Sequence, residues 1–289
     1  MTAGTVDAAD DDVDDAADDD VDDAADDDVD DAAGDVVRIV VTGAGGRMGR
    51  EVIAAAEARE RVEVVAAVNR SATDPVSGIE VANADRLGEL VDAGRPDVLV
   101  DFTGPESAVS YAETAANAGI AVVTGTTGFD EAGIARLRSV SESVPVLKAA
   151  NFARGVAALR RAVREAVAAV PGYDVELTET HHNGKRDAPS GTAKTLLDDV
   201  ESVREDLDRR VHGRAGDAPR DSGEIGVHAR RAGDVTGEHE VLLAGNRETL
   251  ELTHRAGDRG VFAEGAIDAA AWLADRDAGW YAFDDVLDE

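Results

Sequence analysis

The stretch THHNGKRDAPSGTA, residues 180–193, combines two adjacent histidines with a lysine and a Ser-Gly-Thr sequence. Imidazole groups exchange protons near neutral pH, and the ammonium group of Lys185 adds a positive charge beside them. ELTET, residues 176–180, is predicted to be a strand, and HHNGKRDAPSG is predicted to be the loop after it. Apolar residues at helical spacing follow, so Ser190 or Thr192 is predicted to cap a helix. Free backbone amides at a helix start bind anions. We therefore expect a site for a small diacid, with one carboxylate on the helix start and the rest near the histidines and the lysine.

A metal site fits the same stretch less well. Adjacent histidines such as His181 and His182 point in different directions, and no set of Cys or carboxylate ligands accompanies them. A polar surface loop would explain any one of these residues, but it explains their combination poorly. The stretch therefore predicts acid–base chemistry on a small dicarboxylate without a metal.

The composition of the chain narrows the classes of protein to which it can belong. The chain has 289 residues, no cysteine and a formal net charge of −32, and only three of its 29 basic residues are lysines. The length predicts one or two domains, and the lack of cysteine predicts a reducing cytoplasm. The negative charge argues against binding to nucleic acid, which needs clustered Lys and Arg. No signal peptide and no long apolar run is found, so we expect no membrane partner. The excess of acidic residues favours adaptation to a salt-rich cytoplasm, with an acidic protein of ordinary cytoplasm as the alternative.

The N-terminus carries a repeat. The octapeptide DAADDDVD occurs three times in tandem across residues 7–30. A segment so rich in aspartate buries too little apolar surface to fold, so residues 1–35 are predicted to be a disordered acidic tail. An acidic interaction tail and a calcium-binding segment are alternatives, although the repeat lacks the Gly and the terminal Glu of an EF-hand loop.

The segment after the tail is predicted to bind a dinucleotide. A short apolar strand leads directly into GAGGRMGR, residues 43–50, and a helix and a second strand at 62–68 follow. Gly43 permits a tight turn, and the next two glycines allow backbone amides to approach a pyrophosphate. A plain tight turn is the alternative, because a methionine occupies the third glycine position of G-x-G-x-x-G.

The end of the second strand is predicted to select the cofactor. An acidic residue there would bind the ribose 2′-hydroxyl of NAD, whereas this chain has Asn69, Arg70 and Ser71. A guanidinium and a hydroxyl suit a 2′-phosphate. We therefore expect NADPH to be preferred and NADH to be accepted as well, unless Arg70 is only a solvated surface charge.

Strand and helix segments continue to alternate and predict a parallel sheet. Three polar segments, DFT at 101–103, GTTG at 125–128 and AANF at 149–152, follow buried strands. Ligands of such sheets bind at the carboxyl ends of the strands, so these segments are expected to line the nicotinamide and its ribose.

From Gly155 the pattern changes to a long helix and then alternating strand segments, which predicts a second, α+β domain. The predicted fold class is α/β, with a Rossmann-type parallel-sheet nucleotide-binding domain and an inserted α+β domain for substrate binding and oligomerisation. The last helix is expected to pack on the first domain again. The predicted divisions are the tail at 1–35, the nucleotide-binding domain at 36–152, the inserted domain at 153–261 and the returning C-terminal helix at 262–289.

Several motifs together resemble the dihydrodipicolinate reductase family, also called 4-hydroxy-tetrahydrodipicolinate reductase. The motifs are GAGGRMGR (43–50), DFT (101–103), GTTGFDEAG (125–133), AANFARGV (149–156), ETHHNGKRDAPSGTA (179–193), RAGDVTGEHEV (231–241) and AEGAIDAAAWL (263–273). The resemblance covers residues 36–289, and Asn69 stands where the family often has an acidic residue. It implies a cytoplasmic enzyme of lysine and diaminopimelate synthesis that is usually a homotetramer.

The resemblance also implies roles for individual residues. Reduced nicotinamide delivers a hydride to the substrate ring, and the residues matching His181 and Lys185 transfer the proton. The residues expected to hold the substrate carboxylates are His182, Ser190, Gly191, Thr192 and, after domain closure, Thr127. The residues expected to contact the cofactor are Gly43, Ala44, Gly45, Gly46, Arg47, Met48, Asn69, Arg70, Phe102, Gly125, Thr126, Thr127, Ala149, Ala150, Asn151 and Phe152.

Other functions share parts of this pattern. An amino-acid dehydrogenase has a similar nucleotide domain but does not need the whole Lys-to-Thr stretch, and a semialdehyde dehydrogenase needs a cysteine that the chain lacks. A non-catalytic nucleotide sensor would bind the cofactor without turnover.

Overall fold

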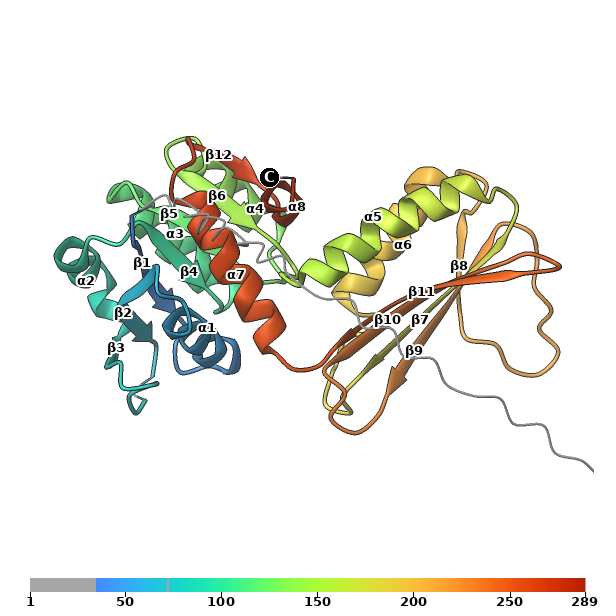
Figure 1. The fold of residues 1–289 in the computed structure, drawn as a ribbon, viewed down its shortest axis with the longest axis horizontal. Helices are drawn as coiled ribbons and strands as arrows, with labels where there is room; N and C mark the ends of the chain where they lie inside the picture. The colour runs from blue at the N-terminus through green and yellow to red at the C-terminus, as the bar shows by residue number, and fades with distance from the viewer. Residues whose placement is uncertain (1–34, 72, 289) are drawn as a thin grey trace, which may run out of the picture. The chain divides into compact units, whose positions relative to one another are not determined.

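The computed structural model describes residues 35–71 and 73–288 (Figure 1). Apart from Asp35, the predicted tail at 1–35 lies outside the described residues. Within the described part of the chain, no helix is long and apolar enough to cross a membrane.

Seven parallel strands form the first sheet, in the spatial order β12-β6-β5-β4-β1-β2-β3. The strands are β1 Val37–Thr42, β2 Val62–Asn69, β3 Val81–Asn83, β4 Val98–Asp101, β5 Ala121–Thr124, β6 Pro145–Lys148 and β12 Gly279–Tyr281. The order reverses at β1, between β2 and β4, and sheets of this kind bind dinucleotides at that position. The Rossmann-type fold predicted from the alternation is confirmed.

Helices cover both faces of the first sheet (Figure 1). Helices α1 and α7 pack against one face in one apolar core, whereas α2, α3 and α4 pack against the other face in a second core. The helices are α1 Arg47–Glu57, α2 Leu87–Gly94, α3 Pro105–Asn117, α4 Glu131–Val140, α7 Gly260–Leu273 and α8 Phe283–Val286, with a 3-10 helix at Ala84–Arg86. Because both faces are covered, β4 and β5 are buried along their whole length.

The C-terminal segment returns to the first sheet. Helix α7 contributes Ala263, Ile267 and Leu273 to the first core, and β12 pairs in parallel with β6 at the sheet edge. The second sheet is thus formed by a segment inserted between β6 and α7.

Five strands form the second, mixed sheet, in the order β11-β10-β7-β9-β8. Its elements are β7 Asp174–His181, β8 Arg209–His212, β9 Glu224–Arg231, β10 Gly237–Ala244 and β11 Thr249–Ala256, with helices α5 Arg154–Ala169 and α6 Gly191–Val203. On β7, Val175 and Leu177 are buried in the core that α5 and α6 share with the sheet. Because side chains alternate along a strand, Glu179 and His181 project to the same helix-covered face.

One predicted boundary is wrong. The sequence placed His181 in the loop after a strand that ended at Thr180, but β7 continues through His181. His181 pairs with Arg231 of β9, and Ala232 donates its N–H to the His181 carbonyl oxygen. Pairing with β9 therefore extends the strand by one residue, and the loop begins only at His182.

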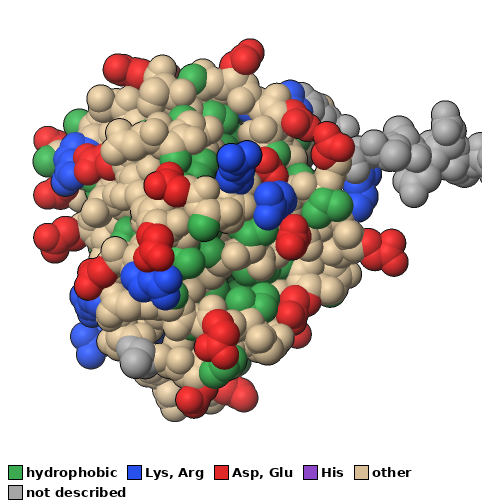
Figure 2. Space-filling view, turned by 90° about the vertical axis from the view of Figure 1, so that its left-hand side faces the viewer, with side chains coloured by type: hydrophobic (Ala, Val, Ile, Leu, Met, Phe, Trp, Pro, Cys, Tyr) green, Lys and Arg blue, Asp and Glu red, His purple; other side chains and the backbone are tan. Residues whose placement is uncertain are grey.

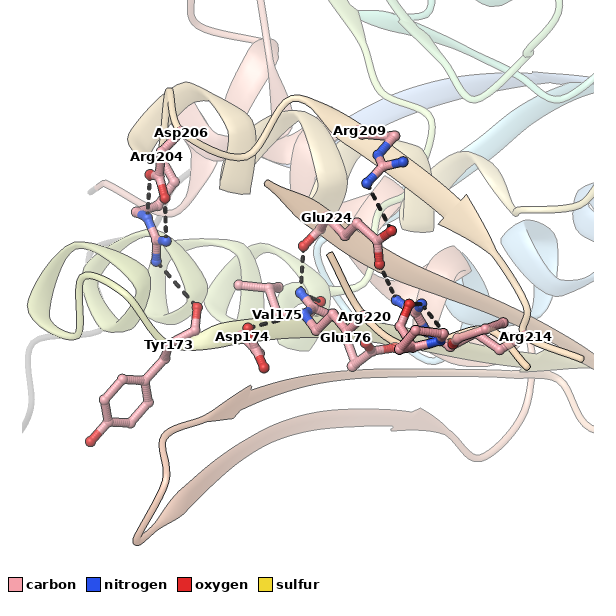
Figure 3. A network of polar contacts seen from close by, with 12 residues as sticks. Tyr173, Asp174, Val175, Glu176, Arg204, Asp206, Arg209, Arg214, Arg220 and Glu224 are labelled. Carbon is pink, nitrogen blue, oxygen red and sulfur yellow. Dashed lines mark hydrogen bonds and ion pairs between the residues drawn. The ribbon is translucent and has the colours of Figure 1, made fainter. Parts of the chain in front are cut away.

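Arginine–carboxylate contacts fix the segment between β8 and β9 (Figure 3). The buried Glu224 pairs with Arg209 and Arg214, while Arg220 pairs with Glu176 on β7. On the face drawn in Figure 2, acidic side chains are spread over the surface with Lys and Arg side chains between them. Such pairing offsets part of the self-repulsion in a chain with a net charge of −32.

Candidate active site

Most of the predicted site residues line one cleft, which has a volume of about 620 Å³. The predicted residues in its lining are Arg47, Met48, Phe102, Gly125, Thr127, Ala150, Asn151, Phe152, His181, His182, Lys185, Ser190, Gly191 and Thr192. Residues of the lining that were not predicted are Gly128, Asp187, Lys194, Thr236, Arg259 and Phe262. The turns of the first sheet and the segment between β7 and α6 therefore face one space.

The turn between β1 and α1 is tight because its glycines have no side chains. Gly43 has a φ of 77°, and a Cβ atom there would lie 2.6 Å from the carbonyl oxygen of Phe102. A Cβ atom on Gly49 would lie 2.2 Å from the carbonyl oxygen of Gly43. Gly49 therefore allows the close helix approach that the third glycine of G-x-G-x-x-G usually provides, although it comes one residue later.

The start of α1 can hold a diphosphate. Gly46 caps the helix without a side-chain hydrogen bond, and the first turn contains no acidic residue. Within the described residues, the N–H groups of Gly45, Arg47 and Met48 donate no backbone hydrogen bond. These N–H groups and the helix dipole suit the pyrophosphate of a dinucleotide, so the turn fits the predicted cofactor.

Asn69 lies next to this turn, and neither Asn69 nor Arg70 belongs to the cleft lining. The Asn69 side-chain amide donates to the carbonyl oxygen of Ser71 at 2.9 Å, and a Cβ atom on Gly45 would lie 2.9 Å from Asn69 Nδ2. Arg70 is exposed, and no ion pair of its guanidinium is found in the described part of the chain. The other predicted cofactor residues that lie outside the cleft lining are Gly43, Ala44, Gly45, Gly46, Thr126 and Ala149.

Asp101 joins the carboxyl ends of β1, β4 and β5. Its carboxylate is completely buried and accepts hydrogen bonds of 2.6–2.8 Å from the hydroxyl groups of four threonines. The four are Thr42, Thr103, Thr124 and Thr126. These donors compensate the buried charge, and they explain why the Thr126 side chain does not reach the cleft. The DFT and GTTG segments are thereby held side by side.

Two contacts complete the nucleotide end of the cleft. A Cβ atom on Gly125 would lie 2.1 Å from a ring carbon of Phe102, so the ring lies directly against this backbone. Asn151 Nδ2 donates to Thr192 Oγ1 at 2.9 Å, while Asn151 Oδ1 accepts from the N–H of Ala153 at 2.8 Å. The AANF segment is therefore bonded to the start of α6.

Ser190 caps α6, which settles the choice between Ser190 and Thr192. Its Oγ atom accepts a hydrogen bond from the N–H of Ala193 at 3.1 Å. The first turn of α6 has no acidic residue, and Gly191 and Thr192 face the cleft. The start of α6 is therefore a second place in this cleft where a helix dipole attracts an anion.

His181 belongs to a buried polar cluster. Its Nδ1 atom lies 2.6 Å from Oε2 of the completely buried Glu179, and Arg231 donates to both carboxylate oxygens at 2.8 Å. Burial lowers the pKa of His181, although the Glu179 carboxylate opposes this effect. Burial raises the pKa of Glu179, but Arg231 and His181 outweigh it, so that pKa lies below its usual value.

Lys185 and His182 face the same cleft from the loop after β7. The Nζ atom of Lys185 lies 2.9 Å from Oδ1 of Asp187. Burial raises the pKa of Asp187, but the hydrogen bond from Lys185 lowers it further, and the net shift is downward. Among residues 35–71 and 73–288, no group of three or more side chains could hold a metal ion. An ammonium group, two imidazoles and a helix start thus surround a space that suits a small dianion and proton transfer.

His239 was not predicted as a site residue. The ring is buried edge to face against His181, with 5.2 Å between the ring centroids, and its Nε2 atom lies 3.0 Å from Ser190 Oγ. Burial, assisted by nearby His181, lowers the pKa of His239 to about 3. The ring is therefore neutral near pH 7, and it can accept the hydroxyl proton of the residue that caps α6.

Glu179 and Arg231 were also missed, although one signal was present. Val175 and Leu177 mark the buried face of β7, and the same alternation places Glu179 on that face. A charged residue at an inward-facing strand position indicates a buried polar contact. No comparable signal in the sequence places Arg231 beside it.

Two sequence models of one family match nearly all of the described chain. The model described as "Dihydrodipicolinate reductase, N-terminus" matches residues 37–152, and "Dihydrodipicolinate reductase, C-terminus" matches residues 155–287. The chain belongs to the dihydrodipicolinate reductase family. The resemblance inferred from the motifs is thereby confirmed.

Relatives from this family are similar over most of the chain. A 4-hydroxy-tetrahydrodipicolinate reductase of Natronomonas pharaonis is 56% identical over 251 residues, which are 87% of this chain and 100% of that protein. The protein of the same name from Haloarcula marismortui is 51% identical over 253 residues, 88% of this chain and 100% of that protein. A solved structure, the dipicolinate-bound dihydrodipicolinate reductase from Paenisporosarcina sp. TG-14, covers 86% of this chain and 97% of its own, with a TM-score of 0.71 and 23% identity. At that identity the likeness shows the fold alone.

Proposed function

We propose that this chain reduces 4-hydroxy-tetrahydrodipicolinate to tetrahydrodipicolinate with NAD(P)H in the synthesis of diaminopimelate and lysine. The observation that carries the proposal is the shared cleft. Residues of the dinucleotide-binding sheet and the His-His-Lys and Ser-Gly-Thr segments line the same space. The family and the relatives at 56% and 51% identity support the same reaction.

The nucleotide end of the cleft would hold the cofactor, which supplies a hydride when it is bound. The amides at the start of α1 would bind the pyrophosphate, and Phe102, Gly125 and the AANF segment would surround the nicotinamide. Arg70 is exposed, and the described residues hold no ion-pair partner for it, which supports a contact to a 2′-phosphate. We therefore expect NADPH to be preferred over NADH.

The other end of the cleft would hold the dicarboxylate. The start of α6 at Ser190–Thr192 would bind one carboxylate, and His182 would bind the other. Thr127 faces them from the first sheet. Closure of the cleft around both ligands would exclude water and align the hydride donor with its acceptor.

Proton transfer is assigned to His181 and Lys185. Loss of the 4-hydroxyl group as water would leave a conjugated ring. The hydride then brings two electrons to the ring carbon that carried this hydroxyl, and one proton must be added to the neighbouring atom. Both side chains line the cleft, and both can regain a proton from water after product release. Asp187 holds the Lys185 ammonium group through its 2.9 Å contact.

We also propose how the protein assembles and in which surroundings it works. The family resemblance favours a homotetramer that assembles through the second sheet, whose edge strand β11 is largely exposed. The net charge of −32 with only three lysines supports work in a salt-rich cytoplasm.

The proposal is tested by following oxidation of NADPH and NADH in molar KCl with freshly prepared substrate. Wild type should turn over, faster with NADPH. Lys185→Ala should lose about a hundredfold in kcat with little change in the KM for nucleotide, because general acid catalysis contributes about that much. Lys185→Arg is the matched control, since a guanidinium keeps the charge but does not release a proton. It should remain nearly as slow as Lys185→Ala.

Two other outcomes would favour one of the alternative functions. A folded wild-type protein that binds nucleotide but oxidises none would favour the sensor. Turnover with an amino acid and NADP⁺, and none with the dicarboxylate, would favour a dehydrogenase.

A further inference from the structure

We propose that Glu179 is a positioning residue for the reduction. Glu179 acts through His181, because its carboxylate holds the His181 side chain in place relative to the start of α6. The inference rests on the proposed reductase function, because His181 is one of the two proton-transfer groups. Glu179 itself does not line the cleft.

The carboxylate of Glu179 connects three separate segments. Its Oε2 atom accepts from His181 Nδ1 at 2.6 Å at the end of β7, and its Oε1 atom accepts from the N–H of Ser190 at 3.1 Å. Arg231, the last residue of β9, donates to both oxygens and also to the carbonyl oxygen of Asp187. One completely buried carboxylate thus fixes a proton-transfer group relative to the proposed substrate-binding helix.

The same contact selects the nitrogen that can react. Because a carboxylate only accepts, neutral His181 carries its proton on Nδ1 and binds or releases a proton at Nε2. No hydrogen bond of this Nε2 atom is found in the described chain, and the atom is not fully buried. A Cβ atom on Gly237 would lie 3.1 Å from Nε2, so glycine keeps this edge of the ring uncovered.

Glu179 is also the neighbour that favours protonation of His181. The charged groups around the ring are Glu179, Lys185 and Arg231, and the neutral ring of His239 packs against it. Burial, Lys185 and Arg231 all lower the pKa of His181, whereas Glu179 raises it. Without that carboxylate, protonated His181 should exist only at lower pH.

The test compares two glutamates of β7. Glu176 also contacts an arginine, Arg220 (Figure 3), and a histidine, His228. It lies on the opposite face of the strand and outside the cleft lining. In the wild-type background, Glu179→Gln should lower kcat by about tenfold or more, with the KM for NADPH unchanged within about twofold. The alkaline limb of the kcat–pH profile should move to lower pH. Glu176→Gln should leave both kcat and the limb unchanged.

A double-mutant cycle tests whether the effect passes through His181. In a His181→Asn background, Glu179→Gln should change kcat by less than about twofold. An equal loss in both backgrounds, or a wild-type kcat in Glu179→Gln, would overturn the proposal. If Glu179→Gln does not fold, Glu179→Asp replaces it, because it keeps the charge but shortens the reach by one methylene. Glu179→Asp should lower kcat and keep the alkaline limb of the kcat–pH profile near its wild-type position. An unchanged kcat would contradict the proposal.

Histidine-labelled NMR separates this proposal from the reductase assignment. The pKa of His181 should be lower in Glu179→Gln than in wild type, whether or not either protein turns over. A wild-type protein without reductase activity would contradict the proposed function. A pKa of His181 that is the same in Glu179→Gln and in wild type would contradict the role proposed for Glu179.

Discussion

Asn151 donates its side-chain amide to Thr192 Oγ1 at 2.9 Å, although the two residues are 41 positions apart in the chain. Asn151 follows the last inner strand of the first sheet, and Thr192 lies in the first turn of α6. The contact joins the segment expected beside the nicotinamide to the segment expected to bind substrate carboxylates. A substrate held at the start of α6 would therefore lie next to the cofactor, as hydride transfer over about 3–3.5 Å requires.

Asp101→Asn should destabilise the fold and weaken cofactor binding. An amide offers one oxygen in place of two to the four hydroxyl donors and buries a new N–H group, which costs about 1–3 kcal/mol in the free energy of unfolding. Urea unfolding and NADPH binding by fluorescence measure the two effects. Asp97→Asn is the matched control. Asp101 is the last residue of β4, whereas Asp97 directly precedes the first residue of this strand. Asp97 is exposed, and its carboxylate accepts a hydrogen bond from the backbone N–H of Arg38. Equal effects of the two substitutions would contradict the role given to Asp101.

Gly49→Ala should destabilise the protein, whereas Gly88→Ala should not. A Cβ atom on Gly49 would press on the Gly43 carbonyl at 2.2 Å, and overpacking of this kind costs about 1–3 kcal/mol. Gly88 is also helical, but nothing lies within 4 Å of its added Cβ, so alanine should stabilise by about 0.5 kcal/mol. Thermal unfolding distinguishes the two. A Gly49→Ala protein as stable as Gly88→Ala would show that α1 does not approach the turn this closely.

Arg70→Ala should change the choice of nucleotide. Loss of a charged hydrogen bond to a 2′-phosphate costs about 1.5–3 kcal/mol, so the KM for NADPH should rise by about tenfold or more. The KM for NADH should remain the same, because NADH has no phosphate there. Arg86→Ala, which removes an exposed arginine paired with Glu89, should change neither value. Equal increases for both nucleotides in Arg70→Ala would argue against the phosphate contact.

Acid should destabilise the protein through His239. Burial lowers the pKa of this ring to about 3, compared with 6.5 for an ordinary histidine, so the unfolded chain binds more protons between these values. The contribution of the neutral His239 ring to the free energy of unfolding is therefore fully present above the ordinary pKa. It declines as the pH falls below that value, by about 2 kcal/mol between pH 7 and pH 5. Urea unfolding should show a smaller loss over this interval for His239→Gln, while the exposed His212→Gln should behave as wild type does. An identical pH dependence of wild type and His239→Gln would contradict the assignment.

The parts of the fold that local sequence determines were predictable. The apolar strand β1, the glycine turn and the amphipathic α1 follow one another in the chain, and the repeated alternation predicts a parallel sheet. Strands β3 and β12 were not predicted, because three residues are too few to form a pattern. Their pairing with β2 and β6 fixes them instead.

The same distinction applies to the cleft. His181, Lys185 and Ser190 lie within ten residues of one another, so their types and spacing could be recognised directly. Arg231 and His239 come from β9 and β10, and only the pairing of these strands with β7 brings them to His181. The boundary predicted before His181 was wrong for the same reason, because pairing with Arg231 extends the strand.

The most direct test of hydride transfer in this cleft is the fate of deuterium carried on the nicotinamide C4 of NADPH. With 4-hydroxy-tetrahydrodipicolinate in molar KCl, the product should contain one deuterium for each nucleotide oxidised when the transferred position is labelled. Lys185→Ala should give the same labelling at a lower rate, because the lysine is assigned to the proton and not to the hydride. A folded wild-type protein that binds NADPH but gives no labelled product would contradict the reductase assignment.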